Sequence, residues 1–394
     1  MTILLSVLRQ RMFAALSVSL FLMGICSSFY GPYLSLFGVR EVGMSPMALG
    51  LFMSASTLAG IAASTAVGFI SDAGACRKRL LMGAIAAGMA GYAVFAFSRH
   101  YAVLLLASLV FLSFSRSTFP QLFALSGEID MRGREENRAL VTGILRAIFA
   151  VGWVVGPVIA AFLLEASGFT ALYLTVVVIF GLLLAIVGLF VREHRRSRAR
   201  RASASGKPAV NRVLALNAAS FSIIYLATGL NAAALPLFVT ETLGASSRHV
   251  GFLLGLAAAL EIPLMVAGGF LVRRIGTLKP IKVGMACYIA YSALVALAHD
   301  PLFLYPVQLL NAMAISQIMS IGISHFQQLD PDRPGTTITL FNNTTAVGNV
   351  LAGAVFGAIV TQFDYRTVYA FVSVFAALAL GLLRLAGNRR EPEP

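Results

Sequence analysis

The two halves of this 394-residue chain repeat one another with a fixed offset of 201 residues. Seven residues of the first half recur in the second with no gap in the register: Leu36, Phe37, Gly43, Ser45, Gly50, Gly68 and Phe69 return as Leu237, Phe238, Gly244, Ser246, Gly251, Gly269 and Phe270. The same offset places Gly152 on Gly353 and Gly156 on Gly357. A duplication of this length predicts two similar units built from the same succession of elements.

Composition fixes the class of those units as membrane-embedded. Hydrophobic residues make up 58% of the chain and charged residues only 12%, and the mean hydropathy is +0.85. Apolar runs of about 18 or more residues are long enough to cross about 30 Å of hydrocarbon as a helix. Twelve such runs are present, six in each half, near residues 12–36, 47–70, 80–98, 101–125, 139–165, 170–190, 213–236, 248–271, 281–298, 302–326, 336–361 and 366–386.

Basic residues orient the predicted spans, because Lys and Arg near helix ends are retained on the cytoplasmic side. With the N-terminus inside, 24 of the 30 Lys and Arg residues fall in cytoplasmic segments and four on the opposite face. We therefore expect an N-terminal six-helix bundle over residues 1–190, a cytoplasmic linker over 191–212 and a C-terminal six-helix bundle over 213–394. The net charge of +14 then indicates contact with anionic lipid and requires no nucleic acid.

Signatures of catalysis are missing from the sequence. No phosphate-binding glycine loop, zinc signature or nucleophile triad pattern is present, and three scattered cysteines fit neither a disulfide pattern nor a metal site. An enzyme is therefore not expected, and neither is a metal or a cofactor. A parallel repeat in a strongly apolar chain is instead typical of a transporter with two helical bundles around a cavity. A monomer is expected, although the repeat itself does not determine the oligomeric state.

The loop after the second predicted span resembles a motif of the major facilitator superfamily. Residues 68–79 hold a glycine, an acid four residues later and then a basic cluster. Residues 269–279 hold a degenerate copy of this motif, in which Arg273 replaces the acid. The resemblance implies an all-α membrane protein with twelve transmembrane helices in two six-helix bundles. It also implies a gate at which Asp72, with Arg77 and Lys78 close behind it, docks on the opposite half when the inner side is closed.

A narrower resemblance, to the bacterial sugar efflux transporters, covers almost the whole chain. It is carried by residues 99–101, 120–125, 153–157, 261–263 and 326–327, with Leu329, Pro331, Arg333, Gly335 and residues 339–341. The resemblance implies a multi-pass protein of the bacterial inner membrane, with both termini in the cytoplasm, that expels sugars or small glycosides by alternating access. Proton antiport is the expected driving reaction.

Polar side chains recur on one face of several predicted spans. Because an unpaired polar group in hydrocarbon is costly, such a face is expected to line a bundle interior or a watery cavity. Amides and arginine can bond to hydroxyls, and aromatic faces can pack on a pyranose ring. Packing between helices is the alternative for each residue. The predicted substrate-binding residues are Tyr30, Arg116, Gln121, Arg146, Trp153, Asn231, Glu261, Asn311, Gln317 and Asn343.

Three of these residues are the only charged side chains well inside predicted spans. Glu261 is expected to neutralise Arg116 or Arg146, or to carry the coupling proton, and a purely structural ion pair is the alternative. His325, near the inner end of its span, is a weaker proton candidate because a histidine at a helix end is usually solvated.

Two other classes of protein remain compatible with the pattern. A proton-driven multidrug antiporter would share the fold, but its cavity should be rich in acids, whereas two arginines and one glutamate favour neutral or anionic polar solutes. A membrane receptor or sensor is less favoured, because no additional signalling domain is recognisable in 394 residues.

Overall fold

The computed structural model describes residues 11–126, 135–191, 212–331 and 333–387, and the elements of the first described part are helices joined by short turns. Its elements are α2 (Arg11–Tyr30), α3 (Leu34–Arg40), α4 (Pro46–Asp72), α5 (Arg77–Phe97), α6 (Tyr101–Ala107), the π-helical turn η1 (Ser108–Leu112), α7 (Ser113–Ser115), α8 (Thr118–Ser126) and α9 (Glu135–Phe190).

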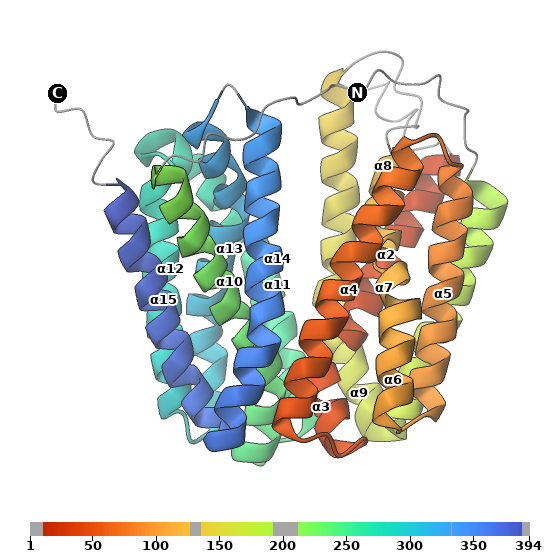
Figure 1. The fold of residues 1–394 in the computed structure, drawn as a ribbon, viewed down its shortest axis with the longest axis horizontal. Coiled ribbons are helices and arrows are strands. Elements are labelled where there is room, and N and C mark those ends of the chain that lie inside the picture. The colour runs from red at the N-terminus through yellow and green to blue at the C-terminus, as the bar shows by residue number, and fades with distance from the viewer. Residues whose placement is uncertain (1–10, 127–134, 192–211, 332, 388–394) are drawn as a thin grey trace. The chain divides into compact units, whose positions relative to one another are not determined.

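The second part follows the same plan with fewer interruptions. Its elements are α10 (Arg212–Leu237), the π-helical turn η2 (Phe238–Thr242), α11 (Ser247–Ile275), α12 (Leu278–Leu297), the short η3 (Pro301–Phe303), α13 (Leu304–Leu329), α14 (Pro334–Gln362) and α15 (Tyr365–Gly387). The long helices lie side by side within each part (Figure 1).

Eleven helical segments in the described part of the chain are long and apolar enough to cross a membrane. One of them, Val141–Phe190, is 50 residues long, about twice what a bilayer requires. It is broken at Gly168, whose backbone angles of 76° and −176° are open essentially to glycine alone. The break separates two spans where the sequence predicted 139–165 and 170–190, so the fold with twelve membrane helices is confirmed.

The chain divides into two compact units, one formed by Met1–Gly43 with Ala55–Arg200 and the other by Met44–Ser54 with Arg201–Pro394. In the first unit α9 packs along both α2 and α5. In the second, α10 lies against α14 and α15, and α13 packs on α11 and α12. The division at residues 1–190, 191–212 and 213–394 stays a prediction, and most of that linker lies outside the described residues.

Glycines allow α2 and α9 to approach at backbone distance. A Cβ atom built on Gly24 would lie 2.3 Å from the carbonyl oxygen of Phe149, and one built on Gly152 would lie 2.3 Å from that of Phe21. Gly156, one turn further along α9, faces the side-chain oxygen of Ser28 and the backbone of Ile25. Small residues at four-residue spacing are the usual basis of close helix packing in membranes, where no hydrophobic force draws helices together.

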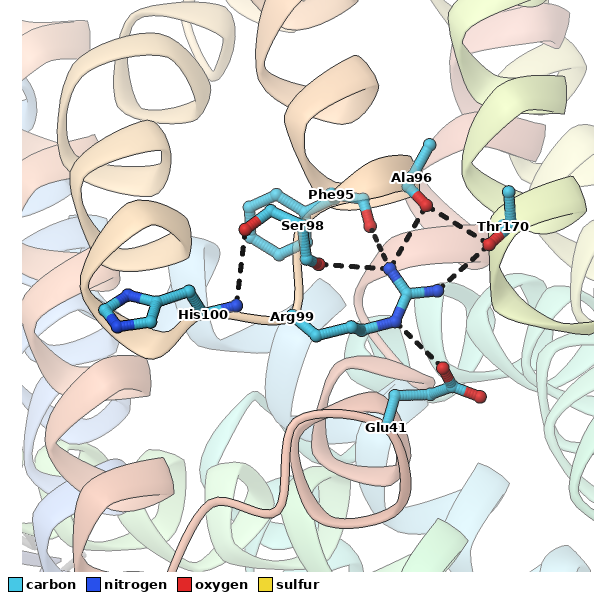
Figure 2. A network of polar contacts seen from close by, with 7 residues as sticks. All are labelled: Glu41, Phe95, Ala96, Ser98, Arg99, His100 and Thr170. Carbon is cyan, nitrogen blue, oxygen red and sulfur yellow. Dashed lines mark hydrogen bonds and ion pairs between the residues drawn. The ribbon is translucent and has the colours of Figure 1, made fainter.

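One arginine binds several elements of the first unit at the end where α5 terminates (Figure 2). Its Nη1 donates to the carbonyl oxygens of Phe95, Ala96 and Ser98 at 3.1, 3.1 and 3.0 Å. Arg99 thereby satisfies carbonyls that the last turn of a helix leaves unpaired, and its charge suits that end of the helix dipole.

The other nitrogens of Arg99 reach the neighbouring elements. Nε forms an ion pair with Glu41, beyond α3, at 2.8 Å, and Nη2 donates to Thr170 of α9 at 3.0 Å. The guanidinium carbon lies 5.2 Å from the centre of the Phe37 ring. All three guanidinium nitrogens are therefore bonded, and one side chain joins the ends of α3 and α5 to α9 just after its break at Gly168.

The second unit places a guanidinium against the corresponding ring and carbonyl. Arg366, in the first turn of α15, donates to the carbonyl oxygen of Ala296 at 2.6 Å and lies 5.4 Å from the centre of the Phe238 ring. Phe238 and Ala296 are the repeat counterparts of Phe37 and Phe95. Asp364 immediately precedes this helix, and hydrogen bonds from the side chain and the backbone of Thr367, in that order of effect, lower the pKa of its carboxyl group.

Replacing Arg99 by alanine is expected to lower the free energy of unfolding by about 1.5–3 kcal/mol, the range for hydrogen bonds to charged groups. Arg99→Lys should recover part of the loss, because a lysine keeps the charge but not the planar fork. Melting curves of the purified protein in detergent measure both changes. Equal melting temperatures for Arg99→Ala and the natural protein would contradict the role of the fork.

Candidate functional site

The helix that carries Arg116 is irregular on both sides of that residue. The π-helical turn η1 ends at Leu112, and residues 116 and 117 form a turn between α7 and α8. The backbone nitrogen of Ser117 bonds to the carbonyl oxygen of Phe114 at 3.1 Å, a tighter pattern than an α-helix has. Arg116, which is exposed, therefore leaves the chain at a local break, and π-turns of this kind occur often at functional sites.

Gln121 and Arg77, predicted for binding and for gating, are joined through a serine. Arg77 Nε donates to Ser71 Oγ at 3.1 Å, and Ser71 Oγ lies 3.5 Å from Oε1 of the buried Gln121. Lys78 Nζ donates to the carbonyl oxygen of Gly188, in the last turn of α9, at 2.8 Å. Both basic residues are thus anchored on their own unit, and the side chain of Asp72 lies outside the described residues.

The remaining predicted residues of the first unit each contact a different set of neighbours. The Tyr30 ring packs edge-on against Tyr92 and Phe95, with ring centres 5.5 and 5.8 Å apart. Arg146 is exposed and holds its guanidinium 5.9 Å from the centre of the Phe123 ring. Trp153 is half-buried on α9 beside Gly152.

In the second unit two predicted amides belong to polar contacts inside the helix packing. Asn231 accepts a hydrogen bond from the Tyr291 hydroxyl at 3.0 Å, and Asn311 Nδ2 donates to Gln308 Oε1 at 2.9 Å. Gln308 Nε2 and Asn311 Oδ1 are buried without a hydrogen-bond partner among the residues that the structure describes. Tyr291 and Gln308 could not be found from the sequence, because their roles depend on which helices are neighbours.

The other predicted residues of this unit lie on α11, α13 and α14. Glu261 is half-exposed on α11, and Asn343 is exposed on α14. Gln317 is 4% exposed, and its Nε2 donates to the carbonyl oxygen of Leu264 at 3.3 Å. The pairing of Glu261 with Arg116 or Arg146 stays a prediction.

His325 differs from the expectation of a solvated residue at a helix end. It is buried, its Nε2 lies 2.9 Å from Asn217 Oδ1 and its Nδ1 lies 3.0 Å from Thr277 Oγ1. The amide nitrogen of Asn217 donates to Val213, so its oxygen is left to accept from Nε2 of the histidine. The imidazole is therefore held at both nitrogens by groups far apart in the sequence, which a reading of the local sequence could not show.

Comparison with known proteins places the whole chain in one superfamily. The model of the Major Facilitator Superfamily matches residues 16–352 and, in a second alignment, residues 218–394. Sugar efflux transporter A of Escherichia coli K12 is 31% identical over 374 residues, which cover 94% of this chain and 95% of the relative. Sugar efflux transporter B of Salmonella typhimurium is 33% identical over 358 residues, which cover 90% of each chain.

Solved structures show the same fold at lower identity. The nucleoside transporter NupG is 14% identical with a TM-score of 0.78, and the match covers 95% of this chain and 98% of that one. A bacterial homologue of the lysosomal transporter Spinster, in an inward-facing and occupied conformation, is also 14% identical, with a TM-score of 0.76 over 95% and 96% of the two chains. At this identity the likeness establishes the fold alone.

Proposed function

Because the chain belongs to the major facilitator superfamily and, within it, to the family of the sugar efflux transporters, we propose that it is a secondary active transporter that exports sugars or small glycosides by alternating access. The observation that carries the proposal is the similarity, over at least nine tenths of the chain, to relatives named as sugar efflux transporters. Side chains that can bond to hydroxyls support it: Arg116 and Arg146 are exposed, and Gln317 holds an acceptor without a partner among the described residues.

Proton antiport is the proposed source of energy, with Glu261 as the proton carrier. A carboxylate within a membrane helix is costly in its charged form, which favours proton uptake when it is enclosed and release when it meets water. The proposed location is the bacterial inner membrane with both termini in the cytoplasm, which follows from the basic residues of the connecting segments. Arg77 and Lys78 are proposed, with Asp72, to act in gating, and the transporter is proposed to work as a monomer.

Everted membrane vesicles test the function directly. Vesicles that contain the protein, with an acidic interior, should accumulate labelled glucose, maltose or methyl glucoside, and an uncoupler should abolish the accumulation if protons drive it. Vesicles without the protein supply the background. Accumulation of a labelled lipophilic cation with none of the sugars would reject sugar export in favour of a multidrug antiporter.

A further inference from the structure

Two polar side chains occupy the same position in the two repeats. Arg116 and Gln317 are separated by the repeat offset of 201 residues, and each belongs to the fourth span of its half. Each side chain also reaches a neighbouring helix of its own unit, α4 for the arginine and α11 for the glutamine. An equivalent position that is polar in both halves, inside spans that are mostly apolar, indicates a shared use.

Arg116 lies across α4 at a glycine. A Cβ atom built on Gly60 would stand 2.2 Å from Arg116 Cδ, 2.7 Å from Nε and 3.4 Å from Cζ. The aliphatic part of the arginine therefore fills the space that any other residue at position 60 would take with its first carbon. Since Cβ contacts shorter than about 3 Å do not persist, an added methyl group requires the flexible arginine to move away from the helix.

Gln317 lies over a glycine of α11 in the same manner. A Cβ atom built on Gly268 would stand 2.6 Å from Gln317 Oε1 and 3.0 Å from Nε2. The nitrogen of this amide is engaged by Leu264 and by Ser316, whose Oγ lies 3.2 Å away. The oxygen is buried without a hydrogen-bond partner among the described residues, so an acceptor remains available in an apolar surrounding.

The two glycines are not repeat counterparts of each other. The counterpart of Gly60 is Glu261, and Gly268 follows seven residues later on α11, two turns along the same face of that helix. Each half thus has its own glycine beneath the equivalent polar side chain. A glycine inherited from the duplication for helix packing would occupy equivalent positions in the two halves. Gly60 and Gly268 do not, but each lies directly beneath one of the two equivalent polar side chains.

We propose that Gly60 and Gly268 are positioning residues, which hold Arg116 and Gln317 in the orientation that binds solute, and that Gln317 Oε1 accepts a hydrogen bond from a sugar hydroxyl. The inference rests on the proposed function and adds the residues that determine its specificity. A long side chain that lies against a helix has already lost much of its rotamer freedom before solute binds. The entropy cost of ordering that side chain therefore lowers the binding affinity less. The arginine offers hydrogen-bond donors and the glutamine an acceptor, and a sugar hydroxyl can complement either of them.

Alanine at each glycine tests the proposal, with a control glycine from a helix of each unit. A Cβ atom built on Gly143 of α9 or on Gly381 of α15 meets nothing within 4 Å. Gly60→Ala and Gly268→Ala should each weaken the binding of labelled glucose or maltose to the purified protein about tenfold. Gly143→Ala and Gly381→Ala should stay within twofold of the natural protein.

A double substitution separates positioning from packing. If Gly60 acts through Arg116, Gly60→Ala should cost nothing further in a chain that already carries Arg116→Ala, and the melting temperature of Gly60→Ala should not fall, since only a flexible side chain must move. An equal loss of affinity in both backgrounds would overturn the proposal.

A structure of the Gly60→Ala protein gives a readout that does not depend on any sugar. Arg116 should have left residue 60 of α4, and an arginine found in its original place would overturn the positioning role. If the natural protein binds none of glucose, maltose and methyl glucoside, the proposed function is rejected. The structure of the Gly60→Ala protein would still test whether Gly60 positions Arg116.

Discussion

Glu261→Gln is expected to abolish efflux driven by a pH gradient while leaving sugar binding measurable. Glutamine keeps the size and hydrogen-bonding capacity of the protonated acid but cannot release a proton, so a cycle that needs proton release stops at that step. The loss should exceed a factor of about 100, because general acid and base groups contribute about 10²–10⁴ to the reactions in which they act. Uptake of labelled maltose into everted vesicles with an imposed gradient measures it.

Exchange of sugar supplies the control that separates coupling from binding. Vesicles loaded with unlabelled maltose should exchange it for labelled maltose through the Glu261→Gln protein, because exchange returns the transporter without net movement of protons. Glu165→Gln, at an exposed carboxylate of α9, is the matched variant and should transport normally. Full gradient-driven efflux by Glu261→Gln would remove both the coupling and the binding role, and would leave Glu261 as a packing residue of α11.

Gly152→Ala is expected to have the largest effect on folding. Its added carbon would lie 2.3 Å from the carbonyl oxygen of Phe21 and 3.2 Å from the carbonyl carbon, so relief requires α2 and α9 to separate. Backbone cannot rotate away as a side chain can, and overpacking of this kind costs about 3 kcal/mol. The midpoint of thermal unfolding and the yield of monodisperse protein in detergent should both fall.

Gly143→Ala on the same helix is the matched control, since a Cβ atom at residue 143 meets nothing within 4 Å. Alanine is favoured over glycine in a helix by about 1 kcal/mol, so this variant should melt no lower than the natural protein. Both substitutions replace glycine by alanine, but their effects on the melting temperature should have opposite signs. If Gly152→Ala melts at the same temperature as the natural protein, α2 and α9 do not meet at this glycine.

Much of the fold could be predicted because the hydrocarbon core imposes a simple demand on length and polarity. The twelve apolar runs correspond to the described membrane helices once the break at Gly168 is counted. The π-helical turns at Ser108–Leu112 and Phe238–Thr242 could not be predicted, since one additional residue in a turn leaves hydropathy unchanged. These turns change the direction in which the following side chains leave the helix, which hydropathy does not record.

The candidate site could be predicted in its residue types but not in its contacts. Polar residues within spans are conspicuous, and Arg116 and Gln317 were found on that basis. Their support by Gly60 and Gly268 depends on which helices are neighbours, and a glycine in a membrane helix has many uses. His325 was expected to be solvated and is instead buried, because its partners Asn217 and Thr277 come from segments far away in the sequence.

The two arginines that cover Phe37 and Phe238 bear on how the halves diverged after duplication. The rings are repeat counterparts, but the arginines are not: Arg99 corresponds to Asp300, and Arg366 corresponds to Glu165. An alignment of one half on the other therefore pairs each cation with an acid. Each unit therefore holds a guanidinium over the same ring and against the same backbone carbonyl, although the two arginines occupy positions that do not correspond in the repeat. The contact, and not the position of the arginine, is what the two halves share.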